Sequence, residues 1–204
     1  MGVKFNKWKQ EFKKQRKKLL ISLFFLIIAL ILYNLAGDYV TDHKGSVVVP
    51  DLILDHFGPY NLTIIYVWFF LIVCILFFYY PFFHKIHDLH YVIKMFSLFV
   101  VIRAGFILLT HLRVPYDAID VGFPSFFNVF NFSNDLFFSG HTGLPFLGFL
   151  LYKNNKKLSY FMLISSLILG VTVLLMHVHY SIDVLSAYFI TYSIYKLGDK
   201  FIRK

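Results

Sequence analysis

The sequence LLISLFFLIIALILYNL, from Leu19 to Leu35, is an almost unbroken apolar run. A transmembrane helix needs about 20 mostly apolar residues, so a run of this kind predicts one membrane crossing. A basic segment precedes it, as in a secretory signal. However, the run is long for a signal core, and no small-x-small cleavage site follows it. We therefore expect an uncleaved first membrane helix.

Five further apolar segments follow along the chain, and each is a candidate membrane helix. They are Leu62–Tyr80, Tyr91–Thr110, Phe137–Tyr152, Tyr160–Met176 and Tyr180–Leu197. The segment beginning at Phe137 is short and is preceded by polar residues. The sequence thus predicts an all-α fold, a polytopic membrane bundle of six transmembrane helices.

The composition agrees with a protein surrounded by lipid. Hydrophobic residues make up 58% of the chain and charged residues only 15%, whereas soluble domains are about half apolar and a quarter charged. We expect a six-helix membrane catalytic domain at 19–197, between a basic cytoplasmic segment at 1–18 and a cytoplasmic tail at 198–204. The one cysteine, Cys74, cannot form an intramolecular disulfide.

The positions of the basic residues predict the orientation of the chain. The net charge is +9, but the basic residues flank apolar runs, which favours the positive-inside bias over nucleic-acid binding. Most of them fall in the N-terminal segment, in the second-to-third and fourth-to-fifth connections, and at the C-terminus. Both termini are therefore expected in the cytoplasm. The segments 38–61 and 114–137 then face the exterior, periplasm or lumen.

Two histidine-bearing stretches would share this outer membrane boundary. One is NDLFFSGHT, Asn134–Thr142, and the other is HVHYSIDV, His177–Val184. His179 and Asp183 are four residues apart, which on a helix puts them on one face. A carboxylate there can accept a proton from one ring nitrogen and leave the other free, as a nucleophile requires.

The residues around the first stretch are suited to an anionic phosphate. Ser139 and Gly140 stand at a helix entrance, where backbone N–H groups are free to bind anions. His141 can protonate a leaving alkoxide, and Arg103, late in its span, offers a planar fork for phosphate oxygens. The set predicts phosphoryl transfer through a phosphohistidine on His179, with no metal or cofactor.

Each of these residues also has a purely structural interpretation. A histidine near a membrane interface often only hydrogen-bonds, an aspartate can pair with a neighbouring helix, and an arginine can extend to the interface. We interpret His84, His87 and His90 as a solvated inner loop and not as a metal site. His177 and His179 point apart on a helix, which argues against a shared zinc ion. His177 competes for the nucleophile role, but Ser181 stands where its carboxylate would be.

These motifs resemble those of the sphingomyelin synthase family, a branch of the type 2 phosphatidic acid phosphatase superfamily. Asp135–Thr142 is similar to the family's Gly-Asp-x-x-x-Ser-Gly-His-Thr motif, with Asn134 in place of the glycine. His179–Tyr188 is similar to His-Tyr-Thr-x-Asp-Val-x-x-Ala-Tyr, with Ser181 in place of the threonine. Weaker similarities are Pro50-Asp51 with Asp55, and Arg103 with Val114-Pro115. The order and spacing hold from about Val49 to Tyr192.

The resemblance implies a six-helix bundle with an outward-facing triad. His179 would be the nucleophile, Asp183 its orienting partner and His141 the acid–base residue. Family members move phosphocholine or phosphoethanolamine from a glycerophospholipid to ceramide. Asp135 would position His141 or bind the headgroup amine. The expected substrate-binding residues are Arg103, Asp135, Ser139, Gly140, Asp51, Asp55 and Tyr180, and the expected partners are the bilayer, a phospholipid and a lipid alcohol.

Several departures leave alternatives open. The chain is compact, lacks the Lys-x6-Arg-Pro motif of ordinary lipid phosphatases, and has Lys196-Leu197-Gly198-Asp199 where an aromatic-histidine tail is expected. The missing motif argues against the ordinary lipid phosphatase branch. The compact chain and its composition, rich in Phe, Ile and Lys, suggest a prokaryotic homologue, for which water or another alcohol could replace ceramide. The alternatives are a lipid phosphatase or phospholipase C-type hydrolase, and a non-enzymatic transporter or scaffold. The oligomeric state stays open.

The headgroup is also open at this stage. A choline cation is favoured by aromatic faces. The outer segments carry several aromatic residues, which either bind such a cation or only form an interfacial belt. They are Phe57, Tyr60, Phe126, Phe127 and Phe130.

Overall fold

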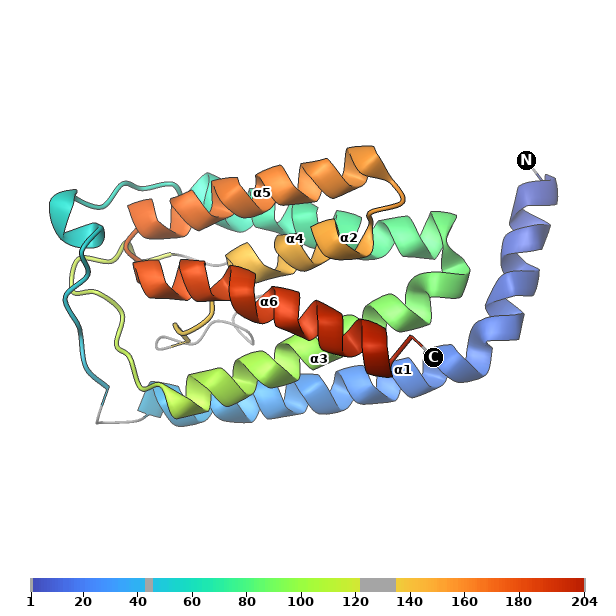
Figure 1. Ribbon diagram of the computed structural model, residues 1–204, viewed down its shortest axis with the longest axis horizontal. Coiled ribbons are helices and arrows are strands. Elements are labelled where there is room, and N and C mark those ends of the chain that lie inside the picture. The colour runs from blue at the N-terminus through green and yellow to red at the C-terminus, as the bar shows by residue number, and fades with distance from the viewer. Residues whose placement is uncertain (1, 43–45, 122–134, 204) are drawn as a thin grey trace.

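Helices make up nearly all of the regular structure. The computed structural model describes residues 2–42, 46–121 and 135–203 (Figure 1). Its α-helices are α1 Gly2–Asp42, α2 Phe70–His84, α3 Ile86–Leu109, α4 Gly140–Leu151, α5 Lys156–Leu175 and α6 Ser181–Phe201. A 3-10 turn, η1 Leu54–His56, and a π-helix, η2 Ile64–Phe69, precede α2. An isolated bridge between Val47 and Leu112 is the only β pairing over these residues. The all-α prediction is confirmed.

Four of the helices are long and apolar enough to cross a membrane, counting only described residues. They lie within Asn6–Asp42, Ile64–His84, Ile86–Leu109 and Lys156–Leu175. At 1.5 Å per residue, the 12 residues of α4 extend about 18 Å, which is short of a hydrocarbon core of about 30 Å. Helix α6 carries Asp183 and three further charged residues. That the chain crosses the membrane six times therefore stays a prediction.

The helices lie side by side, with both chain ends at the same end of the bundle (Figure 1). The turn between α2 and α3 lies at that end, whereas the loops that contain η1 and residues 110–121 lie at the other. The prediction that His84, His87 and His90 lie in a loop is wrong, because His84 ends α2 and the other two lie in α3. Lys85 alone separates α2 from α3, because Ile86, Leu89 and their helical neighbours are buried and extend α3 to the turn.

A proline inside α2 shows how the bundle compensates a lost hydrogen bond. Pro81 has no N–H, so the carbonyl of Phe77 one turn earlier loses its usual donor. The hydroxyl of Tyr152, at the end of α4, donates to that carbonyl instead. Phe77 and Tyr152 are both buried, so the substitute bond fixes α4 against α2 inside the core.

Helix α4 lies in the middle of the bundle and packs against α5 and α6 (Figure 1). It can approach its neighbours closely because Gly143 has no side chain. A Cβ atom at Gly143 would lie 2.9 Å from atoms of Phe99, Phe138 and Thr191. Small residues allow membrane helices to approach in this way. The N-terminus of α4, and the motif it carries, is therefore held deep in the bundle.

Gly143→Ala should lower the thermal midpoint of unfolding of the purified protein in detergent. Forcing a methyl group into this contact costs about 1–3 kcal/mol, which exceeds the gain of up to about 1 kcal/mol from the helix propensity of alanine. Gly105→Ala in α3 is the matched control, since a Cβ there meets no atom within 4 Å. A Gly143→Ala protein as stable as Gly105→Ala would contradict the close approach.

Candidate active site

The two histidine motifs meet where α4 and α6 begin. Ser139, at the start of α4, donates its backbone N–H to the carbonyl of Asp183 over 3.2 Å. Phe138, just before it, has a positive φ of 71°, which non-glycine residues seldom adopt. The chain thus makes a sharp turn into α4 that brings Ser139 against the first turn of α6. Two segments that are distant in sequence therefore form one site.

His179 and Asp183 form a buried pair, but not on one helical face. Helix α6 begins at Ser181, so His179 precedes it and Asp183 lies in its first turn. Oδ2 of Asp183 accepts the backbone N–H of Tyr180 over 2.9 Å and lies 3.3 Å from Nδ1 of His179. The carboxylate reaches back over the helix N-terminus, as the acid of a capping box does. Such a contact favours a proton on Nδ1 and a lone pair on Nε2.

His141, the second residue of α4, is held between two aromatic rings. The ring centroids of Tyr66 and Phe70 each lie 4.0 Å from that of His141, with interplanar angles of 20° and 33°. The imidazole also hydrogen-bonds with the backbone of Tyr66 and interacts electrostatically with His179 and Arg103. Tyr66 comes from the π-helix η2, a feature often found at functional sites. Both faces of the ring are therefore fixed.

Arg103 lies beneath the N-terminus of α4 and is buried. Its Nη1 donates to Oδ2 of Asp135 over 2.6 Å and to the hydroxyl of Tyr33 over 2.8 Å, and its Nε donates to the carbonyl of Phe138 over 3.0 Å. The Tyr33 hydroxyl in turn donates to Asp135. A Cβ atom at Gly140 would lie 3.3 Å from the Arg103 Nε. The guanidinium, whose charge is paired with that of Asp135, thus lies against the N-terminus of α4.

Several buried polar atoms of this site have no hydrogen-bond partner among the described residues. They are Oγ of Ser139, Nε2 of His141, Oδ1 of Asp135 and Oδ1 of Asp183. Buried polar side-chain atoms are usually satisfied in folded proteins. Four such atoms at the meeting point of α4 and α6 indicate a place for a polar ligand.

Asp51 joins the loop between α1 and α2 to the start of α6. Its Oδ2 accepts the backbone N–H of Ser181 over 2.7 Å, and its Oδ1 accepts the Ser181 hydroxyl over 2.7 Å. Oδ1 also accepts the backbone N–H groups of Ile53 and Leu54. Burial raises the pKa of Asp51, but these hydrogen bonds outweigh it and lower the pKa below its usual value. Both carboxylate oxygens of Asp51 are thus hydrogen-bonded to protein groups. One of these groups, Ser181, is two residues after His179 in the chain.

Tyr180 makes a second connection of the same kind. Its hydroxyl donates to the carbonyl of Arg113 over 2.8 Å and accepts the backbone N–H of Val49 over 3.3 Å. The segments that contain Val49 and Arg113 are thereby hydrogen-bonded to Tyr180, the residue that follows His179. In this structure Asp51 and Tyr180 both hold the protein together at the site, where the sequence suggested contact with substrate.

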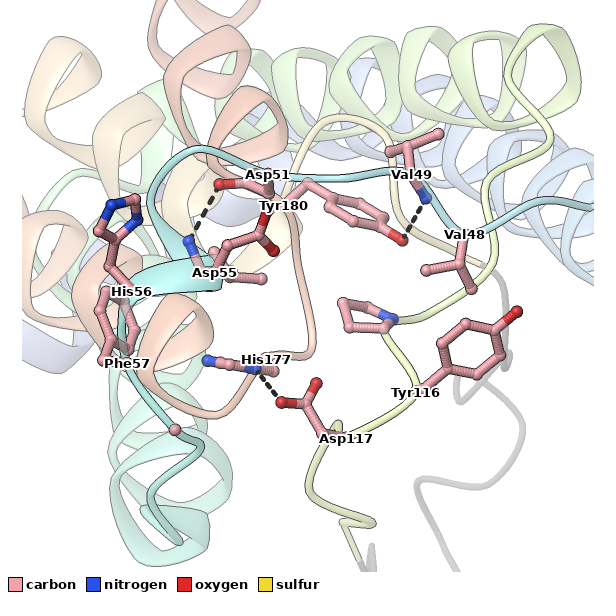
Figure 2. A pocket seen from close by; sticks show the side chains of 13 residues that line it. Val48, Val49, Asp51, Asp55, His56, Phe57, Tyr116, Asp117, His177 and Tyr180 are labelled. Atoms are coloured by element: carbon pink, nitrogen blue, oxygen red, sulfur yellow. Dashed lines mark hydrogen bonds and ion pairs between the residues drawn. The ribbon is translucent and has the colours of Figure 1, made fainter.

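A pocket of about 580 Å³ opens between residues 48–58 and 115–117, beside His177 and Tyr180 (Figure 2). Its lining includes Asp55, His177 and Tyr180, but none of His141, His179 and Asp183. Figure 2 shows His177 turned toward Asp117, with 2.9 Å between Nδ1 and the carboxylate oxygen. The pocket is therefore separated from the triad by the layer that contains Asp51 and Tyr180.

Sequence reasoning missed three partners of the site. The carboxylate that contacts the His177 ring belongs to Asp117, 60 residues earlier in the chain, and not to a residue one helical turn away. Tyr33 reaches Arg103 from α1, and Tyr66 contacts His141 from the π-helix. No local spacing signals these contacts.

The other predicted residues can be placed as follows. Phe57 lines the pocket of Figure 2, with its ring centroid 5.6 Å from that of His177, and Tyr60 is exposed and absent from the lining. Phe126, Phe127, Phe130 and Asn134 lie outside the described residues. Within the described part of the chain, no group of three His, Cys, Asp or Glu side chains is arranged to hold a metal ion.

Residues 133–200 match a protein-family model described as PAP2 superfamily C-terminal. The matched range is about a third of the chain and contains both histidine motifs. It supports the type 2 phosphatidic acid phosphatase superfamily, and with it chemistry of the lipid phosphatase or phosphotransferase type, without distinguishing the sphingomyelin synthase branch. Neither a curated protein nor a solved structure matches the chain.

Asp51→Asn should destabilise the protein by about 1–3 kcal/mol, because an amide cannot replace a charged acceptor at the start of α6. Since the folded pKa of Asp51 lies below its usual value of 3.8, this contribution is complete above that pH. It is lost as the pH falls through the lowered pKa. Unfolding midpoints of wild type and Asp51→Asn should therefore differ at pH 7 and converge in strong acid.

Asp55→Asn is the control for this measurement, because Asp55 is exposed in the same loop. Equal midpoints for Asp51→Asn and Asp55→Asn at pH 7 would refute the assignment of Asp51 as the connection between the loop and α6.

Proposed function

We propose that this protein is a lipid phosphotransferase that moves a phospho-headgroup, phosphocholine or phosphoethanolamine, from a glycerophospholipid to a lipid alcohol such as ceramide or diacylglycerol. The observation that carries the proposal is the meeting of the α4 and α6 N-termini. There His141 and the His179–Asp183 pair lie beside Arg103, among buried polar atoms that lack partners. The family match over residues 133–200 supports the same chemical class.

In the first half-reaction, the phosphate binds the N-terminal N–H groups of α4 and the Arg103 guanidinium. Nε2 of His179 attacks phosphorus, and the bond from phosphorus to the diacylglycerol oxygen breaks. His141 gives its proton to that oxygen, so diacylglycerol leaves as a neutral alcohol. Asp183 stabilises the positive charge that develops on His179. Asp135 keeps Arg103 in place through their ion pair.

In the second half-reaction, the acceptor alcohol enters where diacylglycerol left. Its proton passes to His141, its oxygen attacks phosphorus, and the bond from phosphorus to Nε2 of His179 breaks. His179 is only 3% exposed and Asp183 is fully buried. Such burial keeps bulk solvent away from the phosphohistidine. The similarity of both motifs to the sphingomyelin synthase family is what favours a lipid alcohol over water as the acceptor.

We also propose that the site faces the exterior, periplasm or lumen. The basic N-terminal segment and the C-terminus lie at one end of the bundle, and the loops beside the site lie at the other (Figure 1). The positive-inside rule assigns the basic end to the cytoplasm. A phospholipid of the outer leaflet would then be the donor.

His179→Ala and His141→Ala should each lower turnover at least about 100-fold, because each removes a group that forms or breaks a bond. Asp183→Asn should also lower turnover, but by less, since Asp183 orients His179 and stabilises its charge without itself forming or breaking a bond to phosphorus. The measurement follows labelled phosphatidylcholine or phosphatidylethanolamine into products, with and without ceramide or diacylglycerol. His87→Ala is the matched control, because His87 is exposed and forms its ion pair with exposed Asp88.

The products decide between the possible reactions. A new phospholipid that forms only with the acceptor supports transfer. Release of free phosphocholine or phosphate without an acceptor would replace transfer by hydrolysis. Turnover that survives in both His179→Ala and His141→Ala would overturn the site itself.

A further inference from the structure

An apolar groove lies at the opposite end of the molecule from the candidate site. It has a volume of about 580 Å³ and runs between α1 and α2, with Leu89 and Ile93 of α3 also in its lining. This volume lies within the range of roughly 300–1,000 Å³ that is usual for ligand sites. Every lining residue is apolar or aromatic except Arg16. A groove of this composition suits a hydrocarbon chain with a charged group at one end.

The N-terminal part of α1 is fixed beside this groove. It turns away from the long axis of the bundle (Figure 1). The indole N–H of Trp8 donates to the carbonyl of Phe82 over 2.8 Å, and this carbonyl belongs to the last turn of α2, where helices leave carbonyls without intrahelical donors. Trp8 also stacks on Phe12, with 5.3 Å between ring centroids. Phe12 and Phe82 both line the groove.

This segment has a strong positive charge. Between positions 6 and 18 there are seven exposed basic side chains and one acid, Glu11. The basic residues are Lys7, Lys9, Lys13, Lys14, Arg16, Lys17 and Lys18. A basic segment next to a membrane helix attracts anionic lipids. Arg16 alone among them lines the groove, and its guanidinium can bind a phosphate through two parallel hydrogen bonds.

We propose that this groove binds an anionic phospholipid of the leaflet next to the N-terminal segment. One acyl chain lies between α1 and α2, against side chains such as Leu20, Leu23 and Tyr79, and the phosphate lies on Arg16. The surrounding lysines favour a headgroup with net negative charge over a zwitterionic one. The groove is remote from His141 and His179, so this proposal does not depend on the proposed reaction.

Trp8 provides a direct test, because the chain has only two tryptophans. In a Trp68→Phe background, the fluorescence of Trp8 is measured in phosphatidylcholine vesicles. The vesicles contain increasing fractions of brominated phosphatidylglycerol, or the same series of fractions of brominated phosphatidylcholine. Bromine atoms on an acyl chain in the groove quench Trp8. We expect clearly stronger quenching by the anionic lipid, and half-maximal quenching at a lower fraction of that lipid.

Arg16→Gln should raise that fraction roughly fivefold for the anionic lipid, the order expected for one basic residue near an anionic surface. Lys14→Gln is the matched control, because it removes the same charge from an exposed position on the other side of the helix. Arg16 is exposed, so its loss leaves the fold intact. Equal quenching by the two lipids, or equal effects of Arg16→Gln and Lys14→Gln, would overturn the proposal.

Discussion

Asp183 has a fully buried carboxylate at the first turn of α6, and a buried charge destabilises a fold by several kcal/mol unless it is paired. The pairing is local: the backbone N–H of Tyr180 and the ring of His179 both lie against the same oxygen. This requirement fixes where α6 begins and which way His179 points. Ser139, which donates to the Asp183 carbonyl, then places the start of α4 relative to it. The position of His179 and the start of α4 thus both depend on contacts with Asp183.

Arg103 is a buried positive charge that also needs a partner, and its contacts involve a third helix, α1. Asp135 neutralises the guanidinium, while Tyr33 of α1 contacts both members of the pair. Helix α1 has the most extensive contacts with α3, the helix that carries Arg103. Although most of the apolar surface of α1 is exposed in the structure, this helix therefore contributes to the site. Its Tyr33 hydroxyl adds two hydrogen bonds to the ion pair beneath α4.

The sequence was sufficient to predict an all-α membrane protein, because long apolar runs have few other interpretations. It also predicted that His141, His179 and Asp183 belong together, since both motifs carry chemically matched residues at one expected depth. It could not predict that His179 precedes its helix, because a capping contact and a helical i,i+4 pair share one spacing. Nor could it find Tyr66 or Asp117. A π-helix and a contact across 60 residues depend on tertiary structure.

The connection between Asp51 and Ser181 has a consequence for how such proteins can diverge or be recombined. Loops at a membrane surface usually tolerate exchange, because few buried contacts hold them. Residues 46–63 differ, since Asp51 accepts hydrogen bonds from Ser181 at the N-terminus of the helix that carries Asp183. A chimaera that takes this loop from another protein keeps His179 in place only if the new loop also presents a carboxylate to Ser181. The loop and the start of α6 thus depend on each other structurally.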